Sequence, residues 1–124
     1  MIRRDLWPTA LGATALVLLA AVAANAHAFL DHASPAVGST VHGAPAELRL
    51  WYTQELEPAF STVKVTDASG KDVDKGDTHI DAGDKSQMIV SLQSLPPGTY
   101  HVVWRALSVD THVTSGSFTF DVAP

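Results

Sequence analysis

The sequence predicts an all-β fold, an immunoglobulin-like Greek-key β-sandwich of about seven strands. After residue 26, apolar residues fall into short runs separated by turn-forming residues at fairly even spacing, which is typical of sandwiches. Within the runs, apolar and polar residues alternate, as a strand with one buried face requires. No helical periodicity is found beyond residue 26. The number of strands by itself also allows a small β-barrel.

Three strands are expected in the first half of this region. Residues 28–33 are largely apolar and end where the turn-forming stretch 34–39 begins. Residues 46–53 alternate, with two leucines and a tyrosine on one face and charged residues on the other. Residues 60–67 are rich in β-branched residues and are followed by a turn that contains glycine.

The second half begins with a polar segment and continues with three more strands. Residues 72–85 are rich in Asp, Gly and Lys, so we expect a solvated loop with a short edge strand around 78–80. Residues 87–92 form the next strand, and a Leu-Pro-Pro-Gly turn leads into 99–107, whose tryptophan is expected in the core. The last strand spans about 113–122.

The first 26 residues have the form of a secretory signal peptide. Arg3 and Arg4 precede an apolar run from Leu11 to Ala23, which ends in the small-residue sequence Ala24-Asn25-Ala26. This run is shorter than the roughly 20 residues of a membrane-spanning helix, so we expect cleavage after Ala26 rather than a retained membrane tether. The expected organisation is a signal peptide, 1–26, followed by one domain, 27–124.

Composition excludes several classes of function. The chain has 8 basic and 13 acidic residues, and removal of the leader leaves six and twelve, a formal charge of about −6. This balance argues against nucleic acid as a partner and favours attraction of cations. Because the chain contains no cysteine, disulfides and thiolate metal chemistry are excluded, and imidazole, carboxylate and amine nitrogen remain as the strong metal ligands.

Cleavage after Ala26 would make His27 the first residue. Such a residue offers its free α-amine and its imidazole Nδ1 together, and the two close a chelate ring on a metal. Asp110 and His112 lie between the last two expected strands, and in an extended chain their side chains would point the same way, with Cα atoms about 6.6 Å apart. We therefore expect His27, Asp110 and His112 to bind one metal ion.

Three nitrogens and one carboxylate oxygen in a tetragonal plane suit copper(II) best. Nickel(II) fits the same geometry and zinc(II) fits it less well, and the Irving–Williams order favours copper(II) at equal access. An alternative interpretation is structural, because an Asp-x-His sequence at a strand end is often a turn in which the carboxylate caps backbone amides. His32 is a candidate for an outer contact with the site, whereas His42, His79 and His101 are expected in solvent.

The sequence resembles the CopC copper-resistance proteins of the bacterial periplasm. The resemblance covers residues 27–124 and is strongest in the pattern Tyr-x-Val-x-Trp-Arg-Ala-x-Ser-x-Asp-x-His-x-x-x-Gly from Tyr100 to Gly116. It implies a Greek-key sandwich and one copper(II) ion on His27, Asp110 and His112. It also implies a non-catalytic, monomeric periplasmic carrier that exchanges copper with an inner-membrane transporter of the CopD type.

The sequence departs from the pattern of some CopC relatives at its methionines and at one acidic position. Some relatives carry a methionine-rich loop that binds copper(I), whereas this chain has only Met88 after cleavage, so copper(II) alone is expected. The acidic residue that some relatives place after the second strand is Gln54 here.

Two other functions compete with a copper carrier. The paired histidines also resemble the copper site of lytic polysaccharide monooxygenases, which would make the protein an enzyme. The other alternative is a metal-free adhesion domain with an exposed strand edge.

Overall fold

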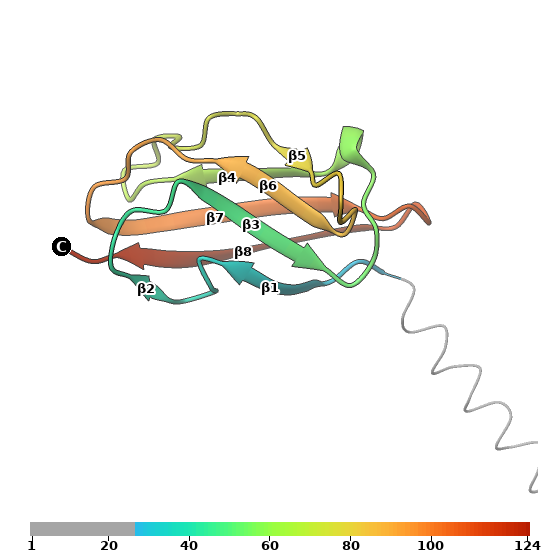
Figure 1. Ribbon diagram of the computed structural model, residues 1–124, viewed down its shortest axis with the longest axis horizontal. Helices are drawn as coiled ribbons and strands as arrows, with labels where there is room; N and C mark the ends of the chain where they lie inside the picture. Colours follow the sequence, from blue (N-terminus) through green and yellow to red (C-terminus); the bar gives the residue numbers. More distant parts are fainter. Residues whose placement is uncertain (1–26) are drawn as a thin grey trace, which may run out of the picture.

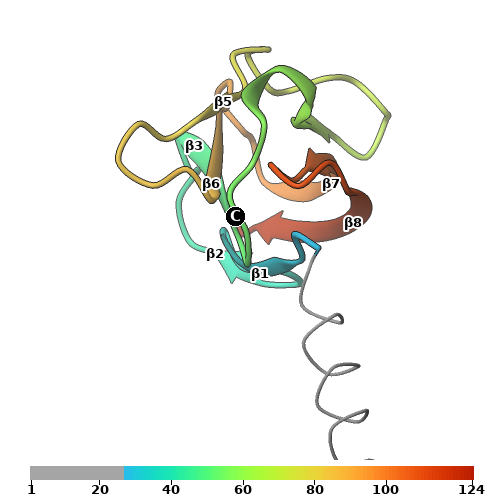
Figure 2. The same cartoon turned by 90° about the vertical axis from the view of Figure 1, so that its right-hand side faces the viewer.

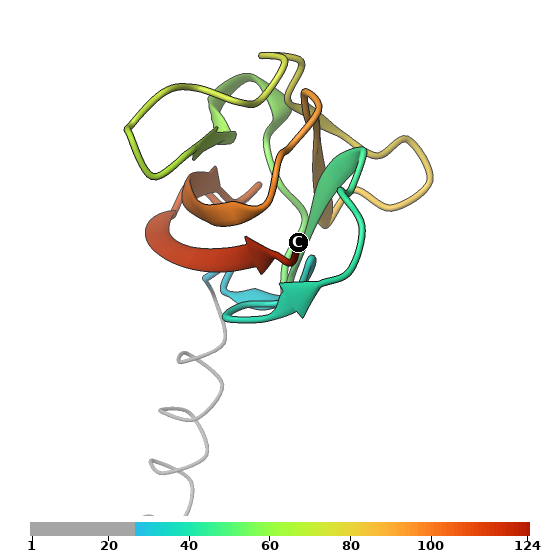
Figure 3. The same cartoon turned by 90° about the vertical axis from the view of Figure 1, so that its left-hand side faces the viewer.

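The computed structural model describes residues 27–124 and shows a two-layered β-sandwich (Figure 1). The strands are β1 (Leu30–Ser34), β2 (Thr40–Val41), β3 (Glu47–Tyr52), β4 (Thr62–Thr66), β5 (His79–Ile80), β6 (Gln87–Ser91), β7 (Gly98–Leu107) and β8 (Val113–Val122), with a 3-10 turn η2 at Pro58–Phe60. They form two four-stranded sheets, ordered β1-β3-β6-β5 and β2-β8-β7-β4. The end views in Figures 2 and 3 show these sheets as two facing layers. The predicted all-β sandwich is confirmed.

The structure has one strand more than the sequence predicted, the short strand β2. Strand β2 has two residues and pairs in parallel with the end of β8, with Thr40 opposite Asp121. A strand this short depends on backbone hydrogen bonds to its neighbour β8, such as the one from Asp121 N to Ser39 O at 2.9 Å. Alternation of apolar residues has no room to show in two residues, so the sequence pattern does not reveal β2.

The core lies between the inner faces of the two sheets. Leu48, Leu50 and Tyr52 of β3 are buried, and the facing strand β7 contributes Tyr100, Val102, Trp104 and Ala106. The strict alternation of buried and exposed residues along β7 shows that one face is in the core and the other in solvent. The expected burial of Trp104 is confirmed, and its ring packs edge to face on Tyr52 with centroids 5.2 Å apart.

Residues 1–26 lie outside the described residues, and cleavage after Ala26 therefore stays a prediction. Between residues 27 and 124, no helix has the length and apolar character needed to cross a membrane. The described chain begins at the same end of the sandwich as the loop between β7 and β8, as Figure 1 shows.

The loop between β7 and β8 differs from the extended geometry that the sequence suggested. Ser108 N donates to His112 O at 3.0 Å and Thr111 N donates to Ser108 O at 2.9 Å, so a tight turn joins the strands. Thr111 has φ = 73°, the left-handed conformation that closes three-residue hairpin loops. Asp110 and His112 are therefore brought together by a turn, and the expectation of an extended chain at this point was wrong.

Gly116 of β8 pairs with Trp104 of β7, and this pairing leaves no room for a side chain. A Cβ atom on Gly116 would lie 2.7 Å from Cζ2 of the Trp104 ring, closer than real carbon contacts. We predict that Gly116→Ala lowers the free energy of unfolding by about 1–3 kcal/mol, because the buried indole must shift. Urea unfolding followed by tryptophan fluorescence measures this.

Gly83→Ala is the matched control for Gly116→Ala. Its added Cβ would lie 3.5 Å from Asp81 Oδ2, an ordinary van der Waals distance. The free energy of unfolding should therefore change by no more than about 0.5 kcal/mol. Equal stability of the two variants would show that Trp104 does not restrict Gly116.

Thr111 generates a second prediction. A β-branched residue with positive φ costs about 1–3 kcal/mol, whereas glycine adopts this conformation freely but loses more backbone entropy on folding. We expect Thr111→Gly to stabilise the metal-free protein by about 1 kcal/mol, which raises the melting temperature by about 4–8 °C. Thr99→Gly, at an exposed position of β7, should instead destabilise the protein. A melting temperature that falls in both variants would contradict the argument from backbone strain.

Candidate metal centre

Two threonines, one from each sheet, hold the start of the described chain. Thr53, just after β3, accepts a hydrogen bond from Phe29 N at 2.9 Å and donates its hydroxyl to His27 O at 3.2 Å. Thr114 of β8 donates its hydroxyl to Ala28 O at 2.6 Å. Ala28 is fully buried between these contacts. The backbone of His27 is thereby fixed at the end of the sandwich where β3 ends and β8 begins.

His27 lies against the loop between β7 and β8, although 84 residues separate it from His112 in the sequence. The His27 and His112 rings meet edge to face with centroids 4.3 Å apart. His112 Nδ1 lies 3.2 Å from Asp110 Oδ1. Contacts therefore join the three residues selected from the sequence into one chain of neighbours, His27 to His112 to Asp110.

The two loop side chains remain accessible. The side chains of His112 and Asp110 are 49% and 43% exposed, so an ion from solvent can reach them. A hydrogen bond from the Ser108 hydroxyl is the main reason that the pKa of the Asp110 carboxyl lies below its usual value, with His112 adding to the effect and partial desolvation opposing it. Asp110 is consequently a carboxylate at neutral pH, the form that binds a metal.

The side chains are close together but do not yet surround a common point. Within residues 27–124, no three His, Asp or Glu side chains form a ready metal-binding group. The edge-to-face rings would have to turn for a nitrogen of each to face one ion, which the exposure of His112 allows. The donor types fit copper(II): imidazole and carboxylate are present, and the α-amine of His27 would be a further nitrogen donor in a chain that begins at His27.

The other histidines do not join this cluster. His32 is exposed, stacks on Trp51 with centroids 4.4 Å apart and pairs with Asp31 at 2.7 Å, and neither contact involves a residue of the candidate site. His79 lies on the edge strand β5, and its Nδ1 is 2.9 Å from Asp77 O. His42 and His101 are exposed, as expected.

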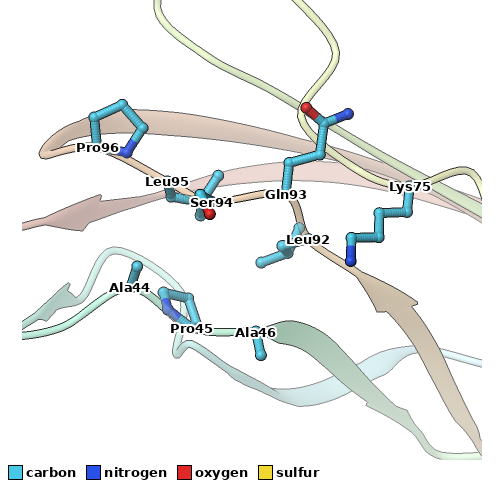
Figure 4. Close-up of a pocket in the computed structure, with 9 residues that line it drawn as sticks. All are labelled: Ala44, Pro45, Ala46, Lys75, Leu92, Gln93, Ser94, Leu95 and Pro96. Carbon is cyan, nitrogen blue, oxygen red and sulfur yellow. The ribbon is translucent and has the colours of Figure 1, made fainter.

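A hollow lies at the other end of the sandwich. Figure 4 shows it between Ala44–Ala46 and Leu92–Pro96, with Lys75 at its side, and it encloses about 570 Å³. Strands β3 and β7 both begin near this hollow and both end near His27. Its lining contains neither imidazole nor carboxylate, so it does not extend the candidate metal centre.

The sequence analysis assigns no role at the candidate site to three residues that the structure places there: Thr53, Thr114 and Ser108, the last of which belongs to the pattern from Tyr100 to Gly116. Threonine and serine are common in strands and turns, and their hydroxyls carry no motif that predicts a partner far away in sequence. Ser108 alone leaves a signal, since it is a polar residue at a position that continues the buried alternation of β7.

The chain is similar in sequence to known proteins. Residues 30–123 match the CopC domain. The protein YobA of Escherichia coli is 39% identical over 98 residues, which cover 78% of this chain and 79% of YobA. The copper transport protein CutJ of Bacillus subtilis is 33% identical over 98 residues, which cover 78% of this chain but only 18% of CutJ.

Two crystal structures share both sequence and fold with the chain. CopC from Methylosinus trichosporium OB3b has a TM-score of 0.74 and 33% identity, covering 79% of this chain and 95% of that structure. PcoC, described as a methionine-rich copper resistance protein from Escherichia coli, has a TM-score of 0.69 and 35% identity, covering 78% and 99%. Since the family domain spans nearly all described residues and the fold is the same, this chain belongs to the CopC family.

Proposed function

We propose that the exported chain begins at His27 and carries one copper(II) ion in the periplasm without catalysing a reaction. The ligands in this proposal are the His27 amine and imidazole, the Asp110 carboxylate and the His112 imidazole. The observation that carries it is the position of His27, whose ring lies 4.3 Å from that of His112 while His112 lies 3.2 Å from Asp110.

Ligand chemistry supports copper(II) as the ion. Three nitrogens with one carboxylate favour copper(II) over other common divalent ions, whereas copper(I) needs several soft thioethers. Met88 is the only methionine in residues 27–124 and is fully buried in the core, so it cannot reach an ion at the surface. This chain thus differs from PcoC, which is a methionine-rich protein.

The comparison with CutJ supports an association with copper transport. In CutJ, a segment like this domain makes up 18% of a longer copper transport protein. A domain that is fused to a transport protein in one organism commonly works beside a separate one in another. We propose that this chain acts as a monomer and exchanges copper with an inner-membrane transporter of the CopD type.

The free N-terminus provides the sharpest test. A protein that retains Ala26 before His27 loses the amine ligand and with it the chelate ring. We expect its copper(II) affinity to fall by more than about 100-fold, because even an outer partner of a metal ligand contributes about 10–100-fold. Competition titration against a chelator measures the affinity, and electron paramagnetic resonance reports the nitrogen ligands.

An extra residue after Pro124 is the control for this extension. The chain end lies at the opposite end of the sandwich in Figure 1, so copper binding should be unchanged. If the Ala26-extended protein binds copper(II) as tightly as the protein that starts at His27, the amine is not a ligand and the proposed site is wrong.

Single substitutions test the two loop ligands. Asp110→Ala and His112→Ala should each weaken copper(II) binding by more than about 100-fold and alter its resonance spectrum. His79→Ala is the matched control and should leave binding unchanged, because His79 is exposed on β5, at the opposite edge of its sheet from β1, and its ring is bonded to Asp77 O. Similar losses in all three variants would mean that copper binds to surface histidines without a defined site.

A further inference from the structure

Ser108 is fully buried and contacts both loop residues of the candidate site, Asp110 and His112. It has no exposed surface, unlike its neighbours Val109 and Asp110. Its hydroxyl contacts Asp110 Oδ1, the amide of His112 at 3.3 Å and the carbonyl of His112 at 3.2 Å. A buried hydroxyl between two candidate ligands is in a position to fix both.

The single hydroxyl proton can be assigned. The His112 amide donates to the Ser108 oxygen, so the oxygen is an acceptor there. The His112 carbonyl already accepts a hydrogen bond from Ser108 N at 3.0 Å. The proton therefore goes to Asp110 Oδ1, where an ionised acceptor makes the bond stronger than one to a neutral carbonyl.

We propose that Ser108 is a positioning residue for copper(II), acting through Asp110. Its hydroxyl holds one carboxylate oxygen of Asp110 and leaves the other for the ion, and it fixes the backbone of His112 in the same turn. Asp110 would otherwise sample several rotamers at the surface and lose that freedom when copper binds. This inference rests on the proposed function, since it assumes that Asp110 and His112 are ligands.

Ser61 provides a matched control for the removal of a buried hydroxyl. Ser61 is 3% exposed, and its oxygen accepts a hydrogen bond from Leu107 N at 3.1 Å, one residue before Ser108. S108A and S61A each remove one buried hydroxyl from the same end of β7, but only S108A removes a contact with Asp110. The measurement is copper(II) affinity of the protein that begins at His27, together with its paramagnetic resonance spectrum.

We expect S108A to weaken copper(II) binding by about 10–100-fold and to shift the resonance parameters, as loss of an outer partner does, while S61A leaves both unchanged. The pair S108T and S108V repeats the comparison with side chains of equal shape, should S108A not fold. S108T should bind copper(II) at least about tenfold more tightly than S108V. Equal affinities within both pairs overturn the inference.

A double-mutant comparison separates positioning from a general structural effect. In a D110A background, S108A should cause a much smaller loss of affinity than in the wild type, because the carboxylate on which the hydroxyl mainly acts is gone and only its bond with the backbone of His112 is left to lose. An undiminished loss in that background overturns the role through Asp110. If D110A itself binds copper(II) like the wild type, the proposed function fails; if D110A is weak but S108A binds like S61A, only the role of Ser108 fails.

Discussion

The anchoring of residues 27–29 between the two sheets is the constraint on which the candidate site depends. Thr53, just after β3, bonds to the backbone of His27 and Phe29, and Thr114 of β8 bonds to the carbonyl of buried Ala28. These bonds place His27 beside the loop that carries His112, although 84 residues lie between the two histidines in the sequence. A chain end is normally the least ordered part of a domain, so the proposed start of the chain at His27 requires such anchoring.

The loop that faces His27 is held equally firmly. Strands β7 and β8 pair along ten residues each, and Trp104 fills the space over Gly116 within that pairing. The turn beyond it includes Thr111 in a left-handed conformation, and local strain of this kind is found at functional sites when the surrounding structure enforces it. The long hairpin supplies that enforcement, so Asp110 and His112 stay together.

The site combines a fixed backbone with accessible side chains. The backbone of His27 and the loop is bonded on several sides, whereas the side chains of His112 and Asp110 remain about half exposed. An ion can thus enter and leave without opening the fold. This arrangement suits the proposed carriage of copper, because the proposed ligands are all groups of the protein and the hollow beside Lys75 lies at the other end of the sandwich.

The sequence predicted seven of the eight strands, the buried face of β7 and the residues to examine as ligands, because alternation and donor chemistry are local properties. How His27, Asp110 and His112 meet became clear only from the tertiary structure, and their role as ligands remains a prediction. The strand β2, the turn that replaced the expected extended segment, and the bonds of Thr53, Thr114 and Ser108 all depend on partners distant in sequence or on a folded loop. Such partners are fixed by the packing of two sheets, which no local pattern of residues encodes.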